Sequence, residues 1–426
     1  MEAIKLHAVL LAQPAPFDKR EHRNPSTSTL PLVNFFQVCL VLASMAPMHF
    51  LPWLRQPDNR TRLPGLLLLG LASIWAVARV ARSMRILFDR SHDLDIYYSL
   101  WFLLKHRDYA DVALSQALYL PHTWIVLTPL FLFGWPAARL LMIAFNLASI
   151  CFLWWRLSRL LGLQGIRRGL LLAFFSGWLA TGLVLGLGNL ALVCVATAVA
   201  AFPFKTTANS AFLALSAMKQ TLVFPLYLHL IFKRPRILIL PFAVFAACGL
   251  AALFWARLSF TEGFKLAKGV MDTANAWTFY DFTCMRRLLV PLLKGGLPLT
   301  LAVWGIWFAL FGGTIRIIKE PLTQLAALLL LSLLPMYHQK YDLVAAVPAL
   351  AIFLRHCSLL WPTLMTISLA SDFGTTFSRF LPAGSPQKLA QVLESAYYPL
   401  LILLILAGLF YVDTRAKTVP LKDSTA

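Results

Sequence analysis

The chain has 426 residues, of which 59% are hydrophobic and 13% are charged, and its mean hydropathy is +0.71. This balance excludes an ordinary soluble globular domain, because many windows approach the roughly 20 apolar residues that cross a bilayer. The formal net charge of +20 first suggests a nucleic-acid partner, but the basic residues fall between apolar stretches, where they determine topology and contact lipid headgroups. We therefore expect an all-α polytopic membrane protein, with membrane lipids and no nucleic acid among its partners.

Residues 1–62 are expected to form an N-terminal extension. Within it, the apolar stretch 30–53 is either an extra membrane segment or an interfacial one, because two prolines weaken its end. The first clear span begins at Leu63, directly after a short basic loop that contains Arg55, Arg60 and Arg62. Since lysine and arginine concentrate in cytoplasmic loops, this end of the span is placed in the cytoplasm.

An acidic and aromatic stretch, Ser91-His92-Asp93-Leu94-Asp95-Ile96-Tyr97-Tyr98, follows that span. It should emerge at the extracytoplasmic face. Two carboxylates so close to hydrocarbon are costly, and such residues are candidates for function. The aromatic and basic residues that come next predict a short amphipathic helix lying in the interface of this first outer loop. The alternative is a loop whose acids merely face water.

Apolar stretches then alternate with short polar loops along the rest of the chain. The loops assigned to the cytoplasm are all basic, as the positive-inside rule requires: 156–168, 205, 233–236, 316–320, 355 and 415–417. This alternation predicts a bundle of about 10–12 transmembrane helices, some of them short or re-entrant, over residues 63–412. Residues 413–426 are expected to form a cytoplasmic tail, and residues 88–119, 257–287 and 336–342 to lie outside.

The segment between Lys205 and Lys233 is too short for two full spans at 1.5 Å per residue, although both ends are placed in the cytoplasm. We therefore predict a re-entrant hairpin with Lys219 and Gln220 at its tip. A lysine at mid-membrane depth is tolerated where it lines a polar cavity. The alternative is that Lys219 reaches an interface with its long side chain and has no function there.

The six cysteines are scattered, mostly within apolar stretches, and no Cys-x-x-Cys spacing occurs. This pattern predicts free thiols packed among helices and neither a disulfide framework nor a metal site. No cofactor is predicted, and the involvement of a divalent metal stays open.

Polar residues on the expected outer face come from widely separated parts of the chain. Acids beside cations suit a reaction in which a base activates a hydroxyl while cations hold a phosphate leaving group. Five of the motifs that contribute these residues are Asp93-Leu94-Asp95-Ile96-Tyr97-Tyr98, Tyr119-Leu120-Pro121-His122, Gly186-Leu187-Gly188-Asn189, Met218-Lys219-Gln220 and Tyr337-His338-Gln339-Lys340-Tyr341-Asp342. In this order they resemble glycosyltransferase family 87, part of the GT-C group of polyprenyl-phosphate-sugar-dependent enzymes. Leu187 stands where the family usually has Gln, and His122 where a second Pro is common.

The resemblance implies a GT-C-like fold over residues 63–412 and a mannosyltransferase-like activity. An inverting enzyme would move a mannose-like or other sugar from a polyprenyl-phosphate donor to an extracytoplasmic lipid or glycan acceptor. Asp93 aligns with the general base, and Asp95 is the second candidate. The cations expected at the donor phosphate are His338, Lys340, Arg286, Arg287 and Lys219. The residues expected to contact substrate are Tyr97, Tyr98, Tyr119, His122, Asn189, Gln220 and Tyr341.

Position alone suggests that Asp342 pairs with Lys340 at the outer surface. The protein is expected in the bacterial cell membrane, with its active site on the extracytoplasmic face. Two other functions stay open: a transporter or flippase of lipid-linked sugar, and an inactive GT-C-like scaffold that binds a lipid. Broken helices and a mid-membrane lysine also suit a transporter. No inverted repeat of hydropathy is evident, however, and the acids are expected at one face of the membrane, away from its midplane.

Overall fold

The computed structural model describes residues 62–89, 93–97, 121–265, 268, 284–293, 296–336, 338–370 and 387–418. All of these belong to one compact unit, residues 59–426. The regular elements within the described ranges are helices, which confirms the all-α class. The predicted N-terminal extension (residues 1–62, with Arg62 the first residue of a helix) and the predicted amphipathic helix of the first outer loop fall outside these ranges almost entirely.

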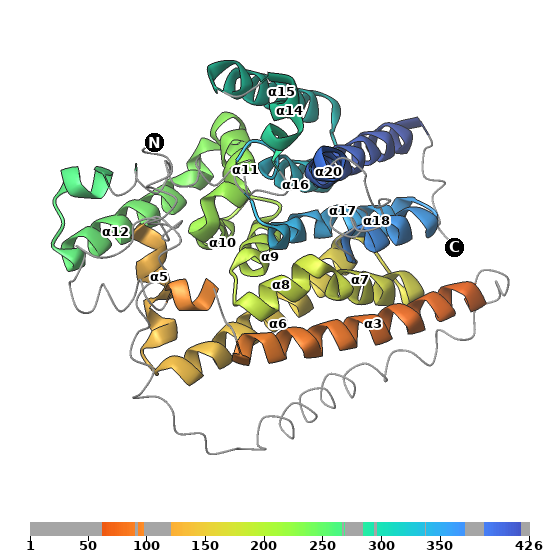
Figure 1. Ribbon diagram of the computed structural model, residues 1–426, viewed down its shortest axis with the longest axis horizontal. Coiled ribbons are helices and arrows are strands. Elements are labelled where there is room, and N and C mark those ends of the chain that lie inside the picture. Colours follow the sequence, from red (N-terminus) through yellow and green to blue (C-terminus); the bar gives the residue numbers. More distant parts are fainter. Residues whose placement is uncertain are drawn as a thin grey trace. The chain divides into compact units, whose positions relative to one another are not determined.

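Figure 1 shows the arrangement of the helices, which are listed here in chain order. They are α3 (Arg62–Asp89), α5 (Pro121–Phe131), α6 (Trp135–Leu161), α7 (Gly165–Gly177), α8 (Leu179–Leu187), α9 (Ala191–Ala201), α10 (Thr207–Ser216), α11 (Gln220–Lys233), α12 (Ile239–Ala256), α14 (Met285–Leu293), α15 (Gly296–Ile317), α16 (Pro321–Ser332), α17 (Val347–His356), α18 (Leu360–Ala370) and α20 (Gln387–Thr418). Three 3₁₀ helices connect some of them: η4 (Ala217–Lys219), η5 (Pro235–Leu238) and η6 (Lys340–Ala346).

Six helical runs among the described residues are long and apolar enough to cross a membrane, although one of them, 207–233, folds back as described below; the bent pair α7 and α8 makes a seventh if it is one span. The protein is therefore a multi-pass membrane protein. The count is lower than the expected 10–12 spans because several apolar helices are short. Helices α5, α9, α16, α17 and α18 have only 10–12 residues each. A helix of that length extends about 15 to 18 Å, roughly half of the hydrocarbon thickness.

The basic loops meet at one end of the helices, which we call the basic end. Side chains there hold neighbouring loops together through backbone groups. Arg156 Nη2 donates to the carbonyl of Phe202 at 2.9 Å, and Arg167 Nη1 donates to the carbonyl of Arg355 at 2.8 Å. Asp413 is buried and accepts from the backbone N–H groups after α15. These contacts bring the predicted cytoplasmic loops together in pairs, while the side of the membrane on which they lie stays a prediction. The predicted tail boundary at residue 413 falls inside α20.

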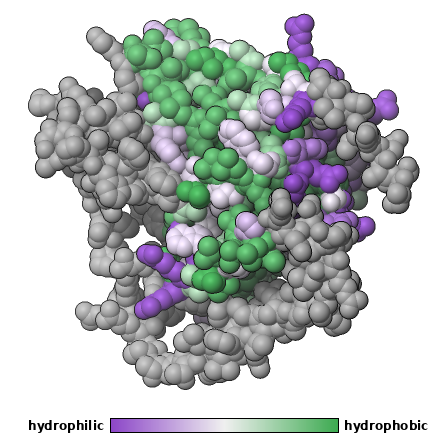
Figure 2. All heavy atoms as spheres, turned by 90° about the vertical axis from the view of Figure 1, so that its right-hand side faces the viewer, coloured by the Kyte–Doolittle hydropathy of each residue, from purple (hydrophilic) through white to green (hydrophobic). Residues whose placement is uncertain are grey.

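Figure 2 views the molecule from the right of Figure 1, the side at which α3 begins and α20 ends. Hydrophilic side chains gather in patches there, beside apolar surface.

The segment 207–233 folds back on itself. Its 27 residues are long and apolar enough for one span, and a straight helix of this length would extend about 40 Å. Lys219 breaks it, however, with φ −120° and ψ 76°. The hydroxyl of Tyr227 then donates to the carbonyl of Leu213 at 2.6 Å, and Arg234 Nη1 donates to the carbonyl of Pro203 at 2.9 Å. Both ends of the segment therefore lie together at the basic end, and the predicted hairpin with Lys219 at its tip is confirmed.

Several turns lie at about the same distance from the basic end. Helices α9, α10 and α16 each have one end at the basic end and contain 10–12 residues. Each of these helices extends about 15 to 18 Å. Their other ends adjoin Asn189, the η4 turn and the start of η6. Gly188, next to Asn189, packs against Leu87 near the end of the 28-residue helix α3, so Asn189 lies beside the end of α3 that is remote from the basic end. The expected position of these polar residues at the outer surface stays a prediction.

Helix α3 packs closely along α7 and α8 (Figure 1). A Cβ atom on Gly177 would lie 2.6 Å from the Trp75 ring, and one on Gly182 would lie 2.8 Å from Arg79. The indole Nε1 of Trp75 donates to the carbonyl of Gly177 at 2.8 Å. Small residues permit such close approach of membrane helices, so these two glycines determine how near α3 lies to the bundle.

The hairpin predicts the sidedness of its two ends. Single cysteines at Lys205 and Lys233, introduced into a variant whose native cysteines are replaced, should react with a membrane-impermeant maleimide from the same side as a cysteine at Gln164. A cysteine at Lys265 should react from the opposite side. All four side chains are exposed, so each site is open to the reagent. Labelling of positions 205 and 233 from opposite sides would show a transmembrane helix in place of the hairpin.

Candidate functional site

Asp93 lies in a helical turn, residues 93–97, and is buried, whereas Asp95 is exposed. The two acids therefore point in different directions, as their spacing predicts. Asn189 Nδ2 donates to Asp93 Oδ2 at 2.7 Å. The other atoms of Asn189 are also held: Oδ1 accepts from the N–H of Ala191 at 2.8 Å, and its carbonyl accepts from Asn146 Nδ2 at 3.2 Å. Asn189 thus fixes one carboxylate oxygen of Asp93 against the first turn of α9.

Gly188 allows this contact to form. Its φ of 72° lies in the left-handed region that favours glycine. A Cβ atom at this position would lie 2.9 Å from the Cβ atom of Leu94. The turn between α8 and α9 and the turn that carries Asp93 therefore pack with no room for a side chain between them.

A second polar cluster, which we call the buried triad, consists of Lys219, Asp342 and His338. Lys219 Nζ contacts Asp342 Oδ1 at 2.5 Å, and His338 Nδ1 contacts Asp342 Oδ2 at 2.9 Å. The exposed fractions are 8% for Lys219, 1% for Asp342 and 0% for His338. The ring of Tyr341 lies 4.4 Å from Lys219 Nζ, which adds a cation–π contact.

The expected pairing of Asp342 with Lys340 is wrong. Asp342 is buried at the first turn of η6 and faces the hairpin tip, while Lys340 is only half-buried. A buried carboxylate needs an opposite charge and hydrogen-bond donors. Lys219 and His338 supply these from inside the protein, so neither the interfacial lysine nor the solvated carboxylate fits the structure.

Helix α9 joins the two clusters. Asn189 precedes it, and Cys194 near its start lies close to Lys219 and Asp342. The η6 segment packs against both α8 and α9. A carboxylate, an amide and a lysine–carboxylate–imidazole group thus surround one end of α9.

His122 and Thr123 satisfy the backbone of the hairpin tip. His122 Nε2 lies 3.1 Å from the carbonyl of Ala217, and Thr123 Oγ1 donates to the carbonyl of Met218 at 3.0 Å. Backbone groups inside a membrane need such partners. Within the described part of the chain, His122 Nδ1 and Gln220 Oε1 are buried and have no hydrogen-bond partner. These two atoms are therefore available to a ligand or to water.

The other predicted site residues are placed less closely together. Arg286 and Arg287 are half-buried on α14, whose first residue donates its N–H to the carbonyl of Leu334 at 2.8 Å. Tyr97 is buried, with an exposed fraction of 1%. Tyr98 and Tyr119 lie outside the described residues. Binding of donor or substrate by these residues stays a prediction.

Two residues of the site were missed in the sequence. Asn146 lies within an apolar span, and a polar residue there is itself a signal of a functional or structural contact. Cys194 lies in α9 and resembles any small apolar core residue, so no sequence signal marks it.

In the described ranges, no group of three or more His, Cys, Asp or Glu side chains could hold a metal ion. No family model, curated protein or solved structure matches the chain. The resemblance to glycosyltransferase family 87 therefore stays a prediction.

The buried triad predicts a strong dependence of stability on charge balance. Replacing Lys219 by Met leaves the Asp342 carboxylate without its cation, and breaking one side of a buried pair typically costs about 3 to 5 kcal/mol. The Lys219→Met variant should therefore unfold at a clearly lower temperature in detergent. The double variant Lys219→Met/Asp342→Asn should recover most of the loss, because the uncompensated charge is gone.

Lys340→Met is the matched control, since it removes a half-exposed lysine from the same motif and should change stability by no more than about 0.5 kcal/mol. Additive losses in the double variant would mean that Lys219 and Asp342 do not act as a pair.

Proposed function

We propose that this protein is an inverting GT-C glycosyltransferase, similar to members of family 87, that uses a polyprenyl-phosphate sugar. The observation that carries the proposal is the contact between Asp93 and Asn189. These residues come from two separate motifs of the resemblance, and the fold brings their side chains to 2.7 Å. Asp93 is the catalytic base, and a lipid or glycan supplies the acceptor hydroxyl.

The geometry suits an acid that accepts a proton in a fixed orientation. Asn189 Nδ2 holds Oδ2 of Asp93, and Asn189 is itself held by Ala191 and Asn146. A positioned base contributes most when its orientation is set before the reaction. In the proposed step, Asp93 takes the proton of the acceptor hydroxyl, and the acceptor oxygen bonds to the anomeric carbon. The bond from that carbon to the phosphate oxygen breaks, and polyprenyl phosphate leaves with inversion.

Cations stabilise the departing phosphate in this proposal. Lys340 is half-buried next to the buried triad, and Arg286 and Arg287 are half-buried on α14. Arginine and lysine bind phosphate through charged hydrogen bonds. Lys219 and His338 contact Asp342. In this proposal they therefore act on the phosphate only through the local electrostatic potential. The basic end faces the cytoplasm of a bacterial cell by the positive-inside rule, and the donor reaches Asp93 from the extracytoplasmic side.

A second function, transport or flipping of a lipid-linked sugar, is favoured by one observation. The hairpin carries Lys219 into the helix bundle, where it contacts Asp342, and transporters place their binding sites between broken helices. An assay of sugar-lipid movement in vesicles without acceptor separates the two functions. A transferase needs the acceptor and leaves free polyprenyl phosphate, whereas a flippase moves the intact donor.

Asp93→Asn should abolish sugar transfer and leave folding intact. The amide still offers an oxygen to Asn189 Nδ2, but it cannot accept the proton, and loss of a general base typically costs about 10²- to 10⁴-fold in rate. Asp95→Asn is the control, because Asp95 is exposed in the same turn. Transfer from radiolabelled polyprenyl-phosphate sugars to membrane acceptors measures both variants. Normal turnover in Asp93→Asn would remove Asp93 from the mechanism, and a larger loss in Asp95→Asn would assign the base to Asp95.

Lys340→Ala should weaken donor binding by about 1.5 to 3 kcal/mol, the scale of a charged hydrogen bond. Lys340 is a better probe than His338, because His338→Ala would also disturb the buried triad. Lys319→Ala removes the same charge at the basic end and should leave the donor affinity unchanged. Equal donor affinities in both variants and in the natural protein would exclude Lys340 from the donor site.

A further inference from the structure

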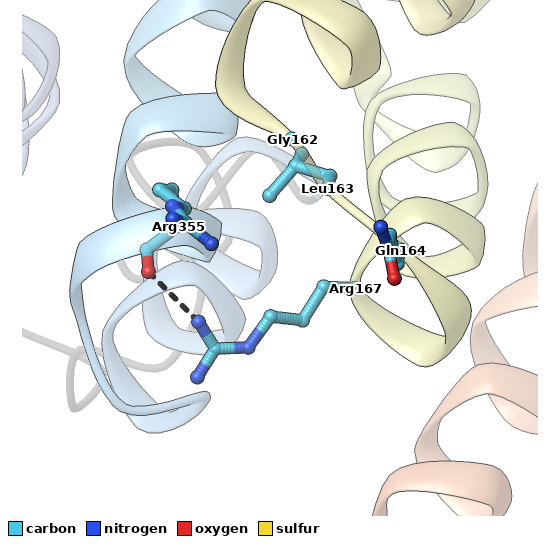
Figure 3. Close-up of a pocket in the computed structure, with 5 residues that line it drawn as sticks. All are labelled: Gly162, Leu163, Gln164, Arg167 and Arg355. Atoms are coloured by element: carbon cyan, nitrogen blue, oxygen red, sulfur yellow. Dashed lines mark hydrogen bonds between the residues drawn. The ribbon is translucent and has the colours of Figure 1, made fainter. Parts of the chain in front are cut away.

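A hollow opens at the basic end, between the turn that joins α6 to α7 and the end of α17 (Figure 3). Its volume is about 470 Å³, and it is lined by Gly162, Leu163, Gln164, Arg167 and Arg355. Arg167 reaches from the first turn of α7 to α17, where it donates to the carbonyl of Arg355 at 2.8 Å. Two arginines from separate helices thus border one concave surface.

The two arginines of this hollow have no carboxylate within ion-pair distance among the described residues. Two acids of the basic end make hydrogen bonds to backbone N–H groups instead. Glu320 accepts from the N–H groups of Leu322 and Thr323 at the start of α16, and Asp413 accepts from the N–H groups of Lys319 and Glu320. Two exposed guanidinium groups without acidic partners are suited to bind a phosphate group.

Apolar surface adjoins the hollow on both sides. Gly65 of α3 packs against Ile166 and Leu359, so α3 and the start of α18 flank the first turn of α7. The side chains of Leu63 and Leu67 on α3, and of Leu360 and Trp361 on α18, are exposed by 56–66%. Exposed leucines next to a tryptophan are typical of the boundary between acyl chains and headgroups.

We propose that the hollow binds the phosphate of an anionic phospholipid in the leaflet at the basic end. Arg167 and Arg355 contact the phosphate, and the acyl chains lie along α3 and α18. Basic pockets between membrane helices on the cytoplasmic side are suited to anionic headgroups. This site lies at the opposite end of α9 from Asp93 and does not depend on the proposed transfer reaction. A phospholipid fits better than a free phosphate because the cations and the exposed leucines are adjacent.

The test uses the full chain, purified in an uncharged detergent and freed of native lipid. Thermal stability is measured while dioctanoyl phosphatidylglycerol, dioctanoyl phosphatidylcholine or inorganic phosphate is added. Phosphatidylglycerol should raise the unfolding temperature in a saturable way and the other two should have little effect. Equal stabilisation by inorganic phosphate would show that the ligand is a soluble anion and not a lipid. Equal stabilisation by phosphatidylcholine would show that the negative charge of the headgroup plays no part in binding.

Arg355→Gln and Arg167→Gln should each raise the half-saturating concentration of phosphatidylglycerol about tenfold or more, the scale of one charged hydrogen bond. Arg355→Gln is the better of the two tests, because it retains the backbone carbonyl of residue 355 that Arg167 contacts. Arg316→Gln removes an exposed arginine elsewhere at the basic end and should leave that concentration within about twofold. The proposal is wrong if all three variants behave alike, or if phosphatidylglycerol does not stabilise the natural protein.

Discussion

A carboxylate buried among apolar helices is the constraint on which much of the structure depends. Asp342 is 1% exposed, and an ion in such a place is tolerated only when a partner charge and donors surround it. Lys219 can reach it because the chain reverses at residue 219, and His338 reaches it from the turn before η6. The hairpin and the 3₁₀ segment are thus positioned by one charge. The carbonyls at the tip of the hairpin in turn need hydrogen-bond donors, which His122 and Thr123 provide.

The same requirement shapes the other cluster around α9. Asn189 is fully buried, and it uses its side-chain oxygen, its side-chain nitrogen and its carbonyl in three separate hydrogen bonds. A half-length helix ends inside the bundle, so its free N–H groups cannot rely on bulk water. The polar residues at such an end are therefore structural first. Asn189 also holds the carboxylate of Asp93, so the residue that provides hydrogen bonds at this helix end orients the acid as well.

Features set by local composition could be predicted from the sequence, and features set by distant pairing could not. The basic loops and the hairpin followed from where Arg156, Lys205 and Lys233 occur, since charge distribution determines topology. The different directions of Asp93 and Asp95 followed from their spacing. The partner of Asp342 did not, because Lys219 is 123 residues away and Lys340 is its near neighbour. Within the described ranges fewer full-length spans occur than the predicted 10–12, because a half-length apolar helix has the same composition as part of a full one.

The glycines that face α3 have a consequence for the acid at its far end. Helix α3 is a single rod of 28 residues, and the turn with Asp93 follows it after a short gap. Gly177 and Gly182 determine how closely this rod approaches α7 and α8, while Gly188 sets the contact at the turn itself. The position and orientation of the Asp93 carboxylate therefore depend on these glycines, because they leave no side chain between the packed elements. A glycine-to-alanine substitution at one of these positions would shift the Asp93 carboxylate without contacting it, so variation at these glycines changes the geometry of the candidate site while every polar residue is retained.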